Sequence, residues 1–339
     1  MTHLTYLEAG VVGLVQGISE MFPVSSLGHN VLIPALIGGS WAKDLNVAAP
    51  ESPYLAFIVG LHVATAIALL IYFWRDWVRI VGGFFSSLRE RRVQTADQKL
   101  AWLIILATIP VGLAGLAFEH AFRVIFGKPV IAAIFLAVNG VILIAGERYR
   151  TRASLAADAA LREARAARAA AVTAPGRPLH AVPGGGSPAV AADPARYERD
   201  DPDGPVQADR RLATMGYPRA LLIGSAQILA LLAGISRDGV AMVAGMARGL
   251  SREDAARFAF LLATPVILAA GVLKVPDLAG PLGAGIRGQI LFGSVLSGVG
   301  AYLSVRFLLR YLRTRTLTPF GVYCLIVGLG SVAFLGLVR

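Results

Sequence analysis

The chain has 339 residues, of which 56% are hydrophobic and only 16% are charged, and its formal net charge is +11. Ordinary soluble domains are roughly 45–50% apolar and about 25% charged, so this composition excludes a soluble or disordered chain and indicates an integral membrane protein. The single cysteine, Cys324, excludes a disulfide scaffold.

Long apolar stretches define the expected transmembrane helices. A helix that crosses the hydrocarbon core needs roughly 20 predominantly apolar residues. Six stretches meet this requirement, namely Tyr54–Trp74, Ala101–His120, Pro129–Gly146, Ala255–Val275, Gln289–Leu309 and Leu317–Leu337. The first residues carry neither the basic flank nor the cleavage site of a signal peptide, so we expect the first apolar segment to remain in the protein.

Two further apolar segments, Leu4–Gly39 and Tyr217–Leu250, are interrupted near their middle by polar and helix-breaking residues. Irregular backbone at membrane depth is tolerated only where protein or a water-filled cavity surrounds it. A pair of interrupted segments in corresponding halves of a chain is the best sequence indication of a binding site at the midplane. We therefore predict two re-entrant helical hairpins.

The two interrupted segments correspond in sequence. A shift of 211 positions superimposes four residues of the first, Gly13, Gln16, Ser25 and Gly28, on Gly224, Gln227, Ser236 and Gly239. Such internal similarity indicates a repeat.

The basic residues set the expected topology. They concentrate in residues 75–99, 147–217 and 310–315, and basic loops stay on the cytoplasmic side. With these loops inside, the two hairpins enter from opposite faces. The predicted fold is an all-α polytopic membrane protein, an inverted repeat of six transmembrane helices and two re-entrant helical hairpins. Eight plain, kinked spans are the alternative.

The expected organisation has three parts: a first membrane repeat in residues 1–146, a cytoplasmic insert in 147–217 and a second membrane repeat in 218–339. Within the insert, Ala153–Val172 is a helix former, whereas Thr173–Pro205 is rich in Pro, Gly and Ala and is expected to be disordered. The insert is either a solvated linker, which we favour, or an arginine-rich helix that contacts anionic lipid headgroups. Because much of the positive charge follows the topology, no nucleic-acid partner is expected.

Ionisable groups inside a bilayer are costly and usually functional. Ser26 and His29 are three residues apart, which favours a hydroxyl–imidazole hydrogen bond and a serine nucleophile with a histidine base. Glu20 can orient the imidazole or hold a divalent cation. Arg237 offers a planar fork suited to phosphate. His62, in contrast, is expected to play a structural role.

Other residues at the two breaks complete a predicted phosphate site. Glycines let backbone N–H groups approach an anion closely, and helix N-termini at the hairpin tips add a positive dipole. The candidate substrate-binding residues are Gln16, Ser25, Gly28, Gly234, Ser236, Asp238 and Gly239. A nucleophile, a base, a phosphate clamp and a possible metal ligand are together what phosphoryl-ester chemistry requires. A substrate that reaches a site at mid-bilayer is expected to be lipid-linked.

The motifs also resemble a known family. The stretch Gln16–His29 reads QGISEMFPVSSLGH and resembles the first signature of the undecaprenyl-diphosphate phosphatases, the bacitracin-resistance family. The run GISRDG at 234–239 resembles the second signature, and GLSREDAARFAFLLATP at 249–265 resembles the stretch that follows it. The resemblance covers both halves and omits residues 147–217.

The resemblance implies hydrolysis of undecaprenyl diphosphate to undecaprenyl phosphate, which recycles the lipid carrier for cell-wall synthesis in the bacterial plasma membrane. By motif position, Ser26 matches the expected nucleophile, His29 and Glu20 match the family's histidine and essential acid, and Arg237 matches its phosphate-binding arginine. Gln16 stands where the family has its first acid. A divalent cation, Mg²⁺ or Ca²⁺, is expected, with Glu20 as a ligand.

The chain departs from the second signature at Ala233, Asp238 and Ala241, where the family has Pro, Ser and Thr. These departures bear on rate and substrate preference. A polyprenyl-phosphate transporter or flippase without hydrolysis is therefore the alternative function, because inverted hairpins around a midplane site are also transporter architecture. The sequence leaves a homodimer open. Membrane lipids and a polyprenyl diphosphate substrate are the expected partners.

Overall fold

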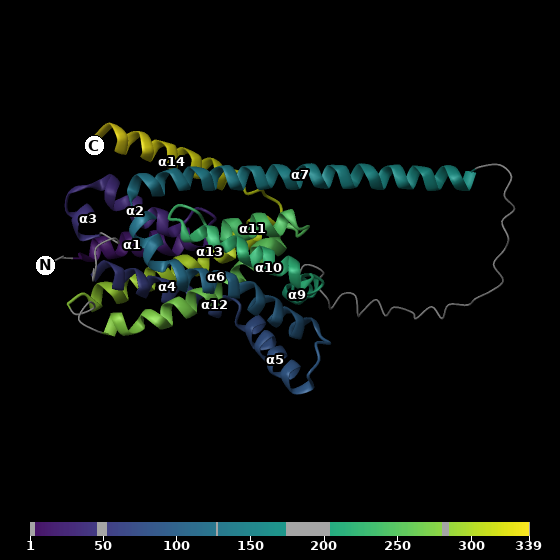
Figure 1. Cartoon of the computed structure of the whole chain (residues 1–339), viewed down its shortest axis with the longest axis horizontal. Helices are drawn as coiled ribbons and strands as arrows, with labels where there is room; N and C mark the ends of the chain where they lie inside the picture. The colour runs from purple at the N-terminus through teal and green to yellow at the C-terminus, as the bar shows by residue number, and fades with distance from the viewer. Residues whose placement is uncertain (1–3, 46–52, 127, 174–203, 280–284, 339) are drawn as a thin grey trace.

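The computed structural model describes residues 4–45, 53–126, 128–173, 204–279 and 285–338. Within these ranges every regular element is a helix (Figure 1). In the first half they are α1 (Tyr6–Met21), α2 (Ser26–Ile37), α3 (Gly39–Asp44), α4 (Pro53–Tyr72), α5 (Trp74–Glu90), α6 (Ala96–Phe126) and α7 (Pro129–Thr173). In the second half they are α9 (Pro205–Ala213), α10 (Tyr217–Ala226), the 3₁₀-helix η1 (Gln227–Leu231), α11 (Arg237–Ala247), α12 (Arg252–Ala279), α13 (Arg287–Leu312) and α14 (Thr318–Val338).

Five helices are long and apolar enough to cross a membrane: α6, α7, α12, α13 and α14. They coincide with five of the six predicted spans. The sixth, α4, qualifies only together with α5, from which it is bent by 84°. The polytopic all-helical class is therefore confirmed, with five or six spans. Of these helices, α12 lies deepest, because 67% of its apolar window is buried against 28–39% in the other four spans.

Helix α5 occupies part of the region that we expected to be a basic loop. Its exposed apolar residues recur every three or four positions, which is the period of an amphipathic helix; they are Trp74, Val78, Val81, Phe85 and Leu88. The opposite face packs against α6.

The first interrupted segment contains α1 and α2. Thr5 and Glu8 form a capping box at the start of α1. After Met21 the backbone becomes extended at Phe22, as expected for a residue before proline. Ser25 then adopts a positive φ of 65°, and its side chain accepts the Gly28 N–H at 3.2 Å, which begins α2. With 12 residues, α2 is about 18 Å long, too short to cross a bilayer.

The second interrupted segment contains α10, η1 and α11. Gly234 has a φ of +111°, and a Cβ there would lie 2.4 Å from the Ala132 carbonyl oxygen, so only glycine fits this position. The Ser236 side chain accepts the Gly239 N–H at 3.1 Å and begins α11. This cap is the equivalent, 211 residues later, of the Ser25–Gly28 cap.

Helix α7 continues through residue 146 without a break and extends well beyond the other helices (Figure 1). The predicted helix at Ala153–Val172 is confirmed as part of it. The segment that we predicted to be disordered falls mainly on residues 174–203, which lie outside the described ranges. Next to it, α9 packs against α6 and α12. The three-part division of the chain stays a prediction.

Candidate active site

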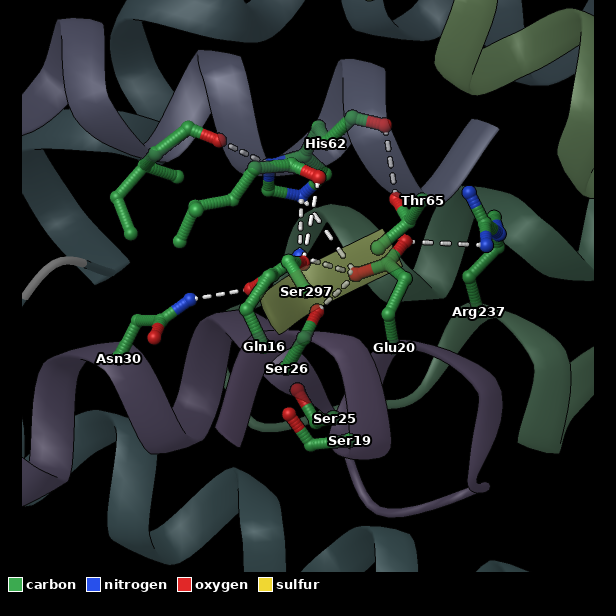
Figure 2. A network of polar contacts seen from close by, with 12 residues as sticks. Gln16, Ser19, Glu20, Ser25, Ser26, Asn30, His62, Thr65, Arg237 and Ser297 are labelled. Atoms are coloured by element: carbon green, nitrogen blue, oxygen red, sulfur yellow. Dashed lines mark hydrogen bonds and ion pairs between the residues drawn. The ribbon is translucent and has the colours of Figure 1, made fainter. Parts of the chain in front are cut away.

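The break between α1 and α2 brings a hydroxyl onto a carboxylate. Glu20 lies in the last turn of α1, and Ser26 is the first residue of α2. Across the break, the Ser26 hydroxyl donates a hydrogen bond to Glu20 Oε2 (Figure 2). Glu20 is only 8% exposed, so this carboxylate depends on such donors to offset its loss of hydration.

The second interrupted segment contributes a guanidinium to the same carboxylate. Arg237 is the first residue of α11, and its NH2 group donates to Glu20 Oε1 at 3.2 Å. Its Nε donates to Asp238 Oδ1 at 3.1 Å. The structure therefore brings Ser26, Glu20 and Arg237 together, although Ser26 and Arg237 lie far apart in sequence (Figure 2).

Gln16 lies one helical turn before Glu20 and joins the same network. Its side-chain amide nitrogen donates to Glu20 Oε2 at 2.9 Å, and its amide oxygen accepts a hydrogen bond from Asn30 Nδ2 at 2.6 Å. Both amides are buried, with Gln16 fully covered. Gln16 therefore contacts the carboxylate directly, and Asn30 is a member of the network that sequence reasoning did not identify.

His62 is the second residue that sequence reasoning missed as part of the site. Its Nε2 lies 3.6 Å from Glu20 Oε2 and 3.3 Å from the Gln16 amide nitrogen. It was expected to be structural, yet it stands near the middle of α4. An imidazole at the centre of an apolar stretch is costly in lipid, and that position is the signal that could have identified it.

In the described structure, the His29 side chain makes no hydrogen bond to Ser26. Its Nδ1 bonds to the Ser25 carbonyl oxygen at 2.7 Å, and its Nε2 bonds to the Tyr323 hydroxyl at 2.8 Å. Because both ring nitrogens are engaged there, the expected Ser26–His29 hydrogen bond does not form. The His29 ring instead lines an apolar cavity of about 480 Å³, whose wall includes Phe22 and Phe320.

The remaining predicted binding residues lie where the two breaks meet. A Cβ on Gly28 would be 3.0 Å from the Gly234 Cα, so the two turns are in contact. Asn139 of α7 joins them, because its side-chain amide donates to the Pro23 carbonyl at 2.9 Å and accepts the Ser236 N–H at 3.0 Å. The hydroxyls of Ser25 and Ser236 are used as helix caps for Gly28 and Gly239.

The carboxylates of the site determine how it could hold a metal ion. In the described part of the chain, no group of three His, Cys, Asp or Glu side chains is arranged to hold a metal ion. Asp238, which is 1% exposed, has one carboxylate oxygen, Oδ2, without a hydrogen-bond partner among those residues. Mg²⁺ is commonly held by one or two carboxylates together with substrate phosphates. Glu20 and Asp238 suit that mode and not an all-protein cage.

The assembled groups define what the site can do. A serine hydroxyl bonded to a carboxylate can lose its proton as it attacks an electrophile. A half-buried guanidinium bonded to the other oxygen of that carboxylate can bind phosphate oxygens and stabilise the charge that develops on them. This arrangement suits phosphoryl transfer through serine.

Comparison with known proteins agrees with this chemistry. The family model "Bacitracin resistance protein BacA" matches residues 9–174 and 188–330. The match therefore extends over most of residues 147–217, which we had expected to lie outside the resemblance.

Curated relatives match over nearly their whole length. The "Undecaprenyl-diphosphatase" of Mycolicibacterium paratuberculosis is 57% identical over 99% of both chains. The "Undecaprenyl-diphosphatase 2" of Frankia alni is 55% identical over 97% of both, and that of Chromobacterium violaceum is 36% identical over 97% of this chain and 98% of its own. The chain belongs to the bacitracin resistance protein BacA family.

Proposed function

We propose that this multi-pass membrane protein is an undecaprenyl-diphosphatase, which hydrolyses undecaprenyl diphosphate to undecaprenyl phosphate and inorganic phosphate. The names of its relatives support the reaction and the substrate. The observation that carries the proposal is the convergence of the Ser26 hydroxyl and the Arg237 guanidinium on the Glu20 carboxylate. Transport alone requires no such activated hydroxyl.

In the first step, Ser26 Oγ attacks the terminal phosphorus of the diphosphate. The Ser26 hydroxyl proton passes to Glu20 Oε2, with which it is already hydrogen-bonded. As the Oγ–phosphorus bond forms, the bond between that phosphorus and the bridging oxygen breaks, and undecaprenyl phosphate leaves. Glu20, and not His29, is proposed as the proton acceptor, since both ring nitrogens of His29 are engaged with Ser25 and Tyr323.

In the second step, water attacks the phosphoserine. The water oxygen bonds to phosphorus as the bond from phosphorus to Ser26 Oγ breaks, and Ser26 Oγ recovers its proton from Glu20. Both water protons remain on the inorganic phosphate, which is released as H₂PO₄⁻. Arg237 is proposed to hold the phosphate oxygens through both steps, because its fork already lies between Glu20 and Asp238. Gln16 and the backbone of Gly28, Gly234 and Gly239 are proposed to line the phosphate pocket, with Ser25 and Ser236 shaping its turns.

A divalent cation, Mg²⁺ or Ca²⁺, is proposed as cofactor. Glu20 and Asp238 Oδ2, which has no hydrogen-bond partner in the described part of the chain, are the groups that would hold it together with the diphosphate. Bound there, it would reduce the repulsion between the diphosphate and the two carboxylates.

The proposed architecture is an inverted repeat with two re-entrant hairpins, α1–α2 and α10–α11. Two observations support it. The serine caps at Ser25 and Ser236 are equivalent in sequence and in hydrogen bonding. The packing is also reciprocal, because α1 lies against α13 of the second half and α10 lies against α6 of the first. The relatives are bacterial, which supports a location in the bacterial plasma membrane and a role in recycling the cell-wall lipid carrier.

The proposed function is tested with purified protein in detergent, undecaprenyl diphosphate and Mg²⁺. Wild type should release inorganic phosphate, and Ser26→Ala should lower the rate at least about 10³-fold, as loss of a nucleophile does. Ser19→Ala is the matched control, because the Ser19 hydroxyl donates only to the Val15 carbonyl of its own helix at 2.6 Å. Binding of the substrate by wild type without release of phosphate, across metals and pH, would instead support the transporter.

A further inference from the structure

The groups that face the two ring nitrogens of His62 indicate which nitrogen donates a hydrogen bond and which accepts one. Its Nδ1 faces the Ile58 carbonyl oxygen at 2.9 Å, and a carbonyl can only accept. A hydrogen therefore resides on Nδ1, and in the neutral ring Nε2 presents a lone pair. That lone pair faces the side-chain amide of Gln16, whose nitrogen is 3.3 Å away (Figure 2).

Asn30 acts on the other end of the same amide. Its Nδ2 is a donor and contacts Gln16 Oε1 at 2.6 Å. His62 thus accepts from the nitrogen end of the Gln16 amide, and Asn30 donates to the oxygen end. A flipped amide would set its oxygen against the His62 lone pair and the Glu20 carboxylate, and its nitrogen against the Asn30 donor.

Burial makes this orientation costly to reverse. Gln16 is fully buried and Asn30 is 2% exposed, so water cannot replace the hydrogen bonds that a flipped Gln16 amide would lose. With the amide fixed, Glu20 Oε2 receives an N–H from Gln16 and the O–H of Ser26, and Glu20 Oε1 receives Arg237. The Ser26 hydrogen consequently points at Glu20, which leaves the Oγ lone pairs free on its other side.

We infer that His62 and Asn30 are positioning residues for the reaction, which act by holding the Gln16 amide in the one orientation that keeps Glu20 turned toward Ser26. The inference rests on the proposed function, in which Ser26 is the nucleophile. Neither residue has to touch the substrate.

The test compares variants at both ends of the amide. His62→Leu and Asn30→Leu should each lower kcat at least about 10-fold and leave KM within about threefold, because ground-state binding is not their role. His62→Gln should stay within about threefold of wild type, since its side-chain oxygen can accept the same N–H. The double variant should have about the same kcat as the more impaired of the two single leucine variants, because both residues act through Gln16.

Thr65→Val is the matched control on α4, since the Thr65 hydroxyl donates only to the His62 carbonyl of its own helix. A structural role for His62 would be indicated if His62→Leu, or both leucine variants, retained wild-type kcat. The inference would likewise be wrong if His62→Gln lost as much activity as His62→Leu.

A second readout separates this inference from the proposed function. The rate at which a fluorophosphonate reagent labels Ser26 reports the reactivity of the hydroxyl without any lipid substrate. Labelling should slow at least about 10-fold in His62→Leu and Asn30→Leu and stay unchanged in Thr65→Val. If wild type failed to hydrolyse the diphosphate while labelling still depended on His62, the proposed function would fall and the positioning role would stand.

Discussion

Glu20 receives hydrogen-bond donors from both interrupted segments, which are remote from each other in sequence. Gln16 and Ser26 approach one oxygen from the first interrupted segment, and Arg237 approaches the other from the second. Glu20 is largely buried, so loss of any of these donors leaves its charge with less compensation than water would provide. Substitutions at this carboxylate therefore affect both the chemistry and the contact between the two segments.

Arg237→Lys should lower kcat/KM about 100-fold. A lysine keeps the charge but has no planar fork, so it cannot contact Glu20 and Asp238 together and still present a donor edge to phosphate. Steady-state phosphate release measures the effect, with Arg219→Lys, an exposed arginine of α10, as the control. Wild-type kinetics in Arg237→Lys would show that the fork is not required.

Glu20→Gln should reduce kcat about 10³-fold while the protein remains folded, because the amide preserves the shape of the side chain but cannot take the Ser26 proton. Single-turnover phosphate release at saturating substrate is the appropriate measurement. A Glu20→Gln variant with more than a tenth of wild-type kcat would assign the proton to another group.

Only some of the residues in the site could be predicted from the sequence. Ser26, Glu20 and Arg237 could be identified because each is a polar or charged residue at a break in an apolar segment. His62 and Asn30 lie inside apolar helices, and their contacts with Gln16 depend on how α1, α2 and α4 pack together. The direction in which Ser26 and His29 point also depends on the positive φ of Ser25, which no spacing rule anticipates.

Helix α10 packs closely against α6, and this contact positions the second interrupted segment against the first half of the chain. A Cβ on Gly224 would lie 1.9 Å from the carbonyl oxygen of Ala107, a distance that no side chain can occupy. The two helices must separate if Gly224 is replaced.

Gly224→Val should therefore lower the melting temperature of the detergent-solubilised protein by several degrees or prevent its accumulation, since overpacking typically costs about 1–3 kcal/mol. Gly82→Ala on α5 is the control, because no atom of the described residues lies within 4 Å of its added Cβ. Equal melting temperatures for Gly224→Val and wild type would contradict the observed packing of α10 on α6.

The elements themselves were largely predictable, because long apolar runs determine where spanning helices form. The exceptions have physical reasons. Helix α5 is amphipathic, and its arginines make the segment resemble a basic loop although its apolar residues recur with a helical period. Helix α9 is polar in sequence, yet it is anchored by Asp209, which bonds to Arg79 at 2.5 Å and to Arg257 at 2.8 Å. Such ion pairs join segments that the linear sequence keeps apart.

For the whole molecule, the charge distribution predicts an orientation. Helices α3 and α5 lie toward opposite ends of the bundle (Figure 1), and Lys43 belongs to α3 whereas Arg91 directly follows α5. The concentration of basic residues near α5 predicts that this end faces the cytoplasm.

This orientation can be measured with single cysteines in a Cys324→Ala background, since Cys324 is the natural cysteine. A membrane-impermeant thiol reagent should label Lys43→Cys in intact cells and Arg91→Cys only after the membrane is opened. Labelling of both from the same side would contradict the predicted topology.

The most direct test of the central claim is to identify the phosphorylated residue during turnover. The purified protein is mixed with undecaprenyl diphosphate, quenched in acid within the first turnover, digested and mapped by mass spectrometry. We predict a phosphoserine at Ser26 in wild type and none in Ser26→Ala. The fraction of phosphorylated protein should rise when the attack of water on the phosphoserine is slowed. Hydrolysis by wild type at full rate with no phosphoserine at Ser26, together with an active Ser26→Ala variant, would contradict a mechanism through the Ser26 hydroxyl.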